Sequence, residues 1–259
     1  MREHCALLIA HCSLRIAHRL PLGRYPPDHH ACDPFLTVLE GEGRVSILYG
    51  TYALPMPPYR SVYLSRPDLE GRYPAVVLAH GAPGLTSSVK AACRRLARFG
   101  YVAVAPDLYR GAAPDPDAMP TARARADLED AVEALGEYWT EWAADRLAVL
   151  GLGAGGPQAA RLAASHGAAT ILIGGAEAVD VETLAGGGGP LLVLISADDA
   201  ETVRDLHDSL GRGQWIRYGD VASGFHDEGS ADYQEASAED AYRRVIEFLD
   251  GHLATVVAV

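Results

Sequence analysis

The chain has 259 residues and a formal net charge of −12, from 34 acidic and 22 basic side chains. A chain of this length can bury enough apolar surface to fold without a metal or a disulfide. Its acidic balance argues against nucleic acid and anionic membranes as partners, since both are repelled by negative charge. We therefore expect a protein of one large domain whose partner is a small molecule.

The first 34 residues form a separate N-terminal extension in this interpretation. No apolar run reaches the roughly eighteen residues of a membrane span, and His11 and Arg15 interrupt the one apolar patch, which argues against a signal peptide. The cysteines follow no regular disulfide framework, so we expect reduced thiols in a cytoplasmic protein. They are Cys5, Cys12, Cys32 and Cys93.

Three histidines of this extension recur every seven residues, at His4, His11 and His18. On a helix, residues two turns apart lie roughly 10 Å from one another along the axis. Metal ligands have to converge on one point. We therefore favour an amphipathic extension with solvated imidazoles over a metal site.

From residue 35 the pattern changes to short apolar strands. The runs "FLTVLEG" (35–41) and "VSILYGTYAL" (45–54) flank Gly41-Glu42-Gly43 and predict a hairpin. A third strand is "RSVYLSRP" (60–67), and "YPAVVLAH" (73–80) is the continuous apolar run of a strand buried in a parallel sheet. A helix over 87–100, ending at Gly100, precedes the strand "YVAVAPDL" (101–108).

The second half continues the alternation. After a Pro-rich loop (111–121), apolar spacings of four and three predict one long helix whose inward stripe runs from Leu128 to Trp142. Strands follow at 146–152, 169–175, 190–197 and 214–220. Helices are expected from Pro157, over 201–210, and from Ser237, where Asp240 completes an imperfect capping box. Residues 35–259 thus predict a single α/β domain with a mostly parallel sheet, helices on both faces and an N-terminal hairpin.

The stretch "VLGLGAGGPQAA" (149–160) contains a G-x-G-x-x-G pattern in Gly151, Gly153 and Gly156. A dinucleotide site requires an acidic residue at the end of the next strand to hold the ribose hydroxyls. Here that strand ends in Gly174 and Gly175, and Glu177 comes later in a loop. The dinucleotide interpretation is therefore our second choice.

A larger pattern uses more of the chain. In order and spacing, "PAVVLAH", "GAPGL", "GYVAVAPDLYRG", "GLGAGG", "PLLVLISADD" and "YGDVASGF" resemble the dienelactone hydrolase family of α/β-hydrolases. The resemblance covers residues 60 to 250, and "GYVAVAPDLY" and "SAEDAYRRVIEFL" are its most specific parts. It implies an α/β-hydrolase fold with a Cys or Ser nucleophile at a sharp strand-to-helix turn, followed along the chain by an Asp and a His.

Only one of these three catalytic positions keeps its residue type. The nucleophile position falls on Gly153, the acid on Asp199 (with Asp198 as the near alternative), and the histidine on Ser223. In this family an acidic residue often follows the strand-end histidine, and this chain has Gly81 at that position. The backbone donors of the oxyanion hole would be Ala154 and either Gly81 or Ala82, because a backbone N–H is present whatever the side chain.

Several further residues are candidates for the same site. His226 lies three residues after Ser223, and either a rearranged loop brings it to the vacated place or it is exposed and salt-bridged. Tyr109 would orient the ligand, and Arg110 would hold a carboxylate or lie on the surface; both follow a strand at the ligand-binding edge. Structural roles are expected for His80 (fixing the turn), Ser87 and Ser88 (helix caps), Cys93 (packing), and Trp139 and Trp142 (core).

Three functions remain open at this point. The first is a non-hydrolytic enzyme that cyclises, isomerises, epimerises or eliminates from a small carbonyl compound, with Asp199 as base. The second is a ligand-binding protein without turnover. The third is a divergent ester or lactone hydrolase that uses His226 with water or an unidentified serine. The first is favoured, without cofactor or metal, as a monomer or homodimer; a composition rich in Ala, Arg and Gly is compatible with bacterial secondary metabolism.

Overall fold

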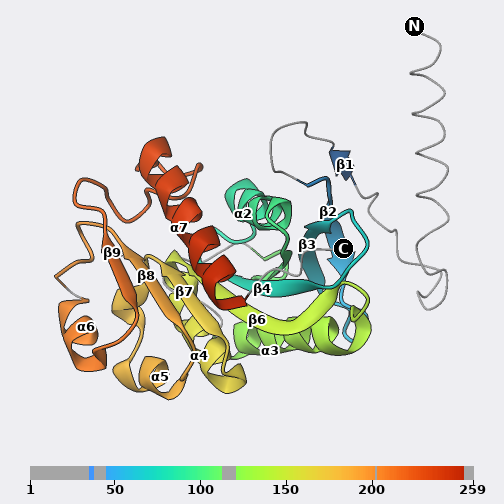
Figure 1. The fold of residues 1–259 in the computed structure, drawn as a ribbon, viewed down its shortest axis with the longest axis horizontal. Coiled ribbons are helices and arrows are strands. Elements are labelled where there is room, and N and C mark those ends of the chain that lie inside the picture. The colour runs from blue at the N-terminus through green and yellow to red at the C-terminus, as the bar shows by residue number, and fades with distance from the viewer. Residues whose placement is uncertain (1–34, 38–44, 113–120, 202, 254–259) are drawn as a thin grey trace, which may run out of the picture. The chain divides into compact units, whose positions relative to one another are not determined.

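The computed structural model describes residues 35–37, 45–112, 121–201 and 203–253, all within the unit Cys32–Val259. A nine-stranded sheet runs through its centre in the order β1-β2-β3-β5-β4-β6-β7-β8-β9 (Figure 1). The strands are β1 (Phe35–Thr37), β2 (Ile47–Ala53), β3 (Ser61–Pro67), β4 (Tyr73–His80), β5 (Val102–Pro106), β6 (Ala143–Leu152), β7 (Ala169–Ile173), β8 (Leu191–Ile195) and β9 (Gln214–Arg217). Strands β4 to β9 pair in parallel, which confirms the mostly parallel α/β sheet.

The antiparallel part of the sheet lies at its N-terminal edge. β1 pairs with β2, with Phe35 opposite Tyr49, and β2 pairs with β3. The antiparallel pairing of β1 and β2 agrees with the predicted hairpin; its turn at 41–43 lies outside the described residues. The extension 1–34, with three of the cysteines and the three spaced histidines, lies outside them as well.

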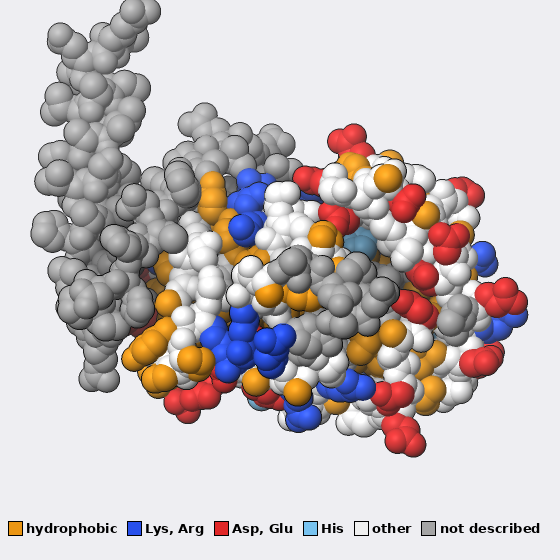
Figure 2. Space-filling view, turned by 180° about the vertical axis from the view of Figure 1, so that it is seen from behind, with side chains coloured by type: hydrophobic (Ala, Val, Ile, Leu, Met, Phe, Trp, Pro, Cys, Tyr) orange, Lys and Arg blue, Asp and Glu red, His pale blue; other side chains and the backbone are white. Residues whose placement is uncertain are grey.

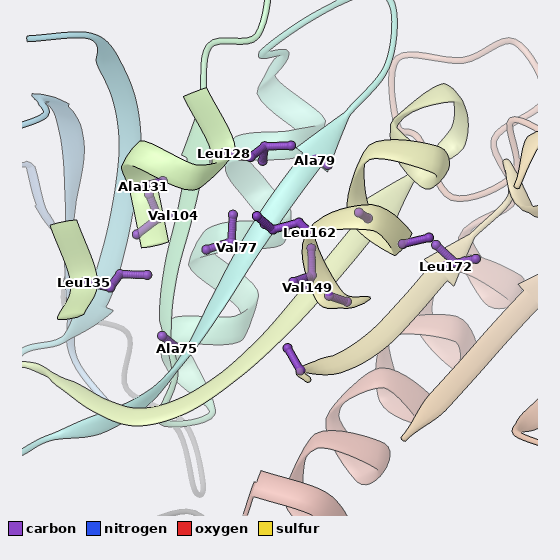
Figure 3. Close-up of a cluster of buried hydrophobic side chains, with 14 of the residues drawn as sticks. Ala75, Val77, Ala79, Val104, Leu128, Ala131, Leu135, Val149, Leu162 and Leu172 are labelled. Carbon is purple, nitrogen blue, oxygen red and sulfur yellow. The ribbon is translucent and has the colours of Figure 1, made fainter. Parts of the chain in front are cut away.

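Helices cover both faces of the sheet (Figure 1). One face carries α2 (Ser87–Arg98) and α7 (Glu235–Leu253), and the other carries α3 (Thr121–Glu133), α4 (Gly156–His166), α5 (Val181–Gly186) and α6 (Arg204–Leu210). Side chains alternate along β4, so that Val77 joins the core beneath α3 and α4 (Figure 3) while Val76 joins the core beneath α2 and α7. This two-sided burial is why β4 reads as an unbroken apolar run.

The long helix expected up to Trp142 is shorter in the structure. α3 passes into a π-helical turn, Ala134–Tyr138, in which Trp139 N–H donates to Ala134 O at 2.8 Å, and the helix ends there. The following residues join the sheet: Tyr73 N–H donates to Trp142 O at 2.7 Å, and β6 begins at Ala143. The Trp142 ring stacks on that of Trp139 after the helix has ended.

Other element ends differ from expectation for local reasons. α7 begins at Glu235, so Ser237 is not its cap; Asp240 instead accepts hydrogen bonds from Arg244 Nε at 2.6 Å and from Tyr218 Oη at 2.8 Å. The N-cap of α2 is Thr86, whose Oγ1 accepts from Val89 N–H, and not Ser87 or Ser88. No helix is predicted from the sequence before the glycine-rich run, so the short helix α5, which ends at Gly186, differs from expectation.

The surface fits the composition. Asp and Glu side chains are scattered over the face in Figure 2, and Lys and Arg side chains form fewer groups, the largest of them near the middle of the view. Within the described ranges, every helix is too short or too polar to cross a membrane.

Candidate functional site

The sharp turn after β6 has an empty apex. Gly153 follows the last residue of the strand, Leu152, and adopts φ +51°, a left-handed conformation that favours glycine. A Cβ built on Gly153 would meet no atom within 4 Å, whereas one on Gly151 would lie 2.8 Å from Gly156 Cα. Close packing therefore explains the glycine at 151 but not the glycine at 153. The turn has the shape and the room for a nucleophile and carries none.

The neighbouring glycines let the ends of two strands, β4 and β7, press against this turn. A Cβ on Gly155 would lie 2.1 Å from Ala79 O at the end of β4. A Cβ on Gly175, just after β7, would lie 1.8 Å from Gly153 O. Backbone contact between strand ends thus accounts for these two glycines, with no phosphate-binding role needed.

The expected oxyanion donors lie side by side. A Cβ on Gly81 would be 3.0 Å from Ala154 N, so the turn after β4 touches the residue that follows the apex. Gly81 is itself buried, and Ala82 is half-buried next to it. This is the arrangement in which two backbone N–H groups can face one substrate oxygen.

The acid position is fixed beside a buried serine. Asp199 follows β8, is partly buried, and its Oδ2 accepts a hydrogen bond from Ser196 Oγ at 2.7 Å. Asp198 is exposed, which favours Asp199 as the residue that faces the site. The same turn reaches the next loop, because Ala197 N–H donates to Val221 O at 3.1 Å.

A second carboxylate near Asp199 was missed by the sequence analysis. Glu177 lies in the 3₁₀ turn Ala176–Ala178 directly after Gly175. Partial burial of its carboxyl raises the pKa of Glu177, and the negative charge of Asp199 adds to the rise. The residue as a whole is exposed, so this carboxylate is also in contact with solvent. Its distance along the sequence from Asp199 gave no sign of this proximity.

The histidine position lies near the turn, and His226 lines a cavity formed by other described residues. Gly153 Cα and Ser223 O each lie 3.8 Å from the same point, a Cβ built on Gly174, so the structure brings Ser223 to the turn. His226 is 8% exposed and lines a cavity under α2 and α7 to which no residue of the turn contributes. The expectation of an exposed, salt-bridged His226 is wrong, because the side chain is buried.

The comparisons with known proteins agree with this geometry. A model of the dienelactone hydrolase family matches residues 61–253. The chain belongs to the dienelactone hydrolase family. A relative from Salmonella typhi named "Putative carboxymethylenebutenolidase" is 29% identical over 227 residues, covering 72% of this chain and 80% of the relative.

Solved structures show the α/β-hydrolase fold of this family. One, described as a "Putative Dienelactone Hydrolase" from Klebsiella pneumoniae, superposes with a TM-score of 0.62 at 24% identity, over 80% of this chain and 99% of that one. A dienelactone hydrolase from Anabaena variabilis gives 0.59 at 14% identity, over 85% and 98%. At these identities the likeness concerns the fold alone.

Two other candidate ligand-binding residues, Arg110 and Tyr109, make contacts within the protein. The Arg110 guanidinium donates from Nε (3.0 Å) and NH2 (2.8 Å) to the two carboxylate oxygens of buried Asp127. A carboxylate partner is therefore already present within the protein. Tyr109 is buried, and its ring stacks on that of His80 with centroids 6.1 Å apart.

His80 and Cys93 have the environments expected of structural residues. His80 Nδ1 lies 3.1 Å from Gly81 O and Nε2 lies 3.0 Å from Pro106 O, so the ring ties the turn after β4 to the end of β5. Cys93 is fully buried in α2, and burial raises the pKa of its thiol to about 12, so it is not a nucleophile at neutral pH.

The buried imidazoles predict a loss of stability in acid. Burial lowers the pKa of both His80 and His226. Both then stay neutral in the folded state, while the unfolded chain takes up protons once the pH falls below about 6.5. The contribution of these two groups to the unfolding free energy should therefore be constant above that pH. Below it the unfolding free energy should decrease, by at most about 1.4 kcal/mol per pH unit for each imidazole.

Urea unfolding between pH 7.5 and 5.5 measures this slope. His226→Gln should make the slope shallower, because one of the two titrating groups is gone, whereas His252→Gln, a change at an exposed histidine, should leave it as it is. A slope that His226→Gln does not alter would show that this imidazole does not contribute.

Proposed function

We propose that the turn at Gly153 catalyses a non-hydrolytic, non-covalent reaction of a small carbonyl compound: a cyclisation, isomerisation, epimerisation or elimination. The observation that carries this proposal is the left-handed apex that bears only hydrogen and faces open space. Covalent acyl transfer needs a hydroxyl or thiol there. The space that such a side chain would fill is free for the substrate.

The remaining groups can still stabilise charge on a carbonyl oxygen. Ala154 and Gly81 lie at two strand ends that touch, since a Cβ on Gly81 would be 3.0 Å from Ala154 N, and in this proposal the N–H groups of Ala154 and of Gly81 or Ala82 are the donors. Backbone donors that are held in place before the reaction can contribute about 3 kcal/mol to an oxyanion such as an enolate. These donors act equally well on an enolate and on a tetrahedral intermediate, so they survive the loss of the nucleophile.

Asp199 is the base in this proposal. It removes the proton next to the carbonyl, and the electron pair moves onto the oxygen held by the backbone donors. The hydrogen bond from Ser196 fixes one carboxylate oxygen and leaves the other for the substrate. Ser223, close to the turn and exposed, would orient the ligand. No cofactor or metal takes part in this step.

Exchange of carbon-bound hydrogen tests the proposal. A panel of small ketones, lactones and β-keto esters is incubated with the protein in D₂O, and loss of the signal from the hydrogen next to the carbonyl is followed by proton NMR. We expect exchange with at least one class of compound and a loss of about 100-fold in Asp199→Asn, the usual contribution of a general base.

Asp198→Asn is the matched control, since it makes the same change one residue away at an exposed side chain. It should exchange at the wild-type rate. Equal rates in the two variants would contradict the role of Asp199. A compound that raises the thermal midpoint without any exchange would instead identify a binding protein without turnover.

A further inference from the structure

A second polar cavity lies away from the turn at Gly153. It is enclosed by α2, by the loop after β9 and by α7, and its volume of about 20 Å³ is enough for about one water molecule. No residue of the turn or of the ends of β7 and β8 lines it. The lining residues used below are Ser88, Arg95, His226, Glu228 and Tyr233.

His226 lines this cavity, and one of its ring nitrogens makes no hydrogen bond to a described residue. The side chain is nine-tenths buried, and its Nδ1 has no hydrogen-bond partner among the described residues. An edge-on contact with the ring of Phe225, at 5.6 Å between centroids, helps to hold the imidazole. Buried polar atoms in folded proteins almost always have partners, so an unpaired one needs an explanation. Burial keeps the imidazole neutral at pH 7, the form that accepts a proton.

Ser88 lines the same cavity and is also unpaired. It lies in the first turn of α2, is 8% exposed, and no hydrogen bond joins its Oγ to any residue that the structure describes. The side chain that caps this helix is that of Thr86, so Ser88 does not act as the cap. The N-terminal end of a helix favours negative charge, so it stabilises a serine alkoxide and the oxyanion that forms from it.

We propose that Ser88 and His226 form a nucleophile–base pair that reacts with small acyl and phosphonyl electrophiles, at a site separate from the turn at Gly153. The two side chains line the same water-sized cavity, and Nδ1 of His226 has no hydrogen-bond partner among the described residues. No direct hydrogen bond joins them in the structure, and such bonds often tighten only when a ligand is bound. The proposal does not depend on the non-hydrolytic function.

The chemistry balances with water as the only co-reactant. Ser88 Oγ bonds to the carbonyl carbon while its proton moves to His226 Nδ1. The alcohol then leaves with that proton, and water cleaves the acyl-serine by the same route to release the acid. Glu228 is exposed and lines the cavity where the rest of the substrate would meet solvent, and the negative charge of Asp227 favours the imidazolium of His226. Arg95 is already bound to Glu239 through NH1 at 2.8 Å.

Labelling of the full chain with a fluorophosphonate tests the proposal. Oγ displaces fluoride from phosphorus, and the mass of the stable adduct is located by peptide mapping. We expect one adduct, on Ser88, absent in Ser88→Ala and formed about 100-fold more slowly in His226→Gln. Ser87→Ala changes the exposed serine in the same turn of α2 and should label like the wild type.

The readout separates this proposal from the previous one, because an adduct on one peptide does not require turnover at Gly153. An unlabelled wild-type protein, or an adduct on another residue, overturns the proposal. An adduct on Ser88 that forms equally fast in His226→Gln overturns the role of the histidine. Should Ser88→Ala fail to fold, Ser88→Cys with iodoacetamide gives the same decision, through the dependence of the alkylation rate on His226.

Discussion

Replacing Gly175 with alanine is expected to lower the unfolding free energy by about 4 kcal/mol or more. The added Cβ would lie 1.8 Å from Gly153 O, and the residue has φ +71°. The clashing atom belongs to the backbone of the turn after β6, so no flexible side chain can move aside. Either β7 or this turn has to shift, and the contact between Gly81 and Ala154 would be disturbed. Urea unfolding followed by circular dichroism measures the loss.

Gly167→Ala is the matched control for this experiment. Gly167 ends α4 at φ +60°, and a Cβ there would meet no atom within 4 Å. Its substitution therefore carries the left-handed strain alone, about 1 to 2 kcal/mol. The difference between the two variants isolates the clash at the turn. Losses of equal size in the two variants would mean that the backbone contact between Gly175 and Gly153 is not tight.

The sheet could be predicted because its strands are local patterns. Apolar runs such as 73–80 are buried on both faces, and this burial alone makes them recognisable in the sequence. The end of α3 could not be predicted in the same way. The apolar spacing continues up to Trp142, but the sheet draws this residue away through the bond from Tyr73, which is 69 positions earlier. A contact between distant residues decides where the helix stops.

In the candidate site, too, some positions follow from local patterns and others depend on contacts between distant residues. The positions of Gly153, Asp199 and Ser223 follow from the order of strands and turns, so the resemblance to the family is enough to predict them. The burial of His226 and its cavity shared with Ser88 depend on how one loop packs under two helices. The ion pair of Arg110 likewise depends on α3, and no local pattern indicated that Asp127 would be its partner.

Asp127 provides the second large expected effect. Its carboxylate is 1% exposed and accepts hydrogen bonds from the guanidinium groups of Arg60 and Arg110. These arginines come from the approach to β3 and from the turn after β5, so one carboxylate joins two loops to α3. Asp127→Asn keeps the size of the side chain but removes the charge, which leaves two partly buried cations without their common partner.

Breaking a buried ion pair by removal of one partner costs about 3 to 5 kcal/mol, and we expect Asp127→Asn to lose about 3 kcal/mol of unfolding free energy because Arg110 is partly exposed. Asp130→Asn is the matched change one helical turn later. Asp130 is 27% exposed and lies 3.0 Å from Arg60, so its loss should stay within about 1 kcal/mol. Urea unfolding at low and high salt separates the two, because salt screens the exposed pair more strongly. If both variants lost the same small amount, the carboxylate of Asp127 would not hold these loops together, and the order of the turn after β5 would need another source.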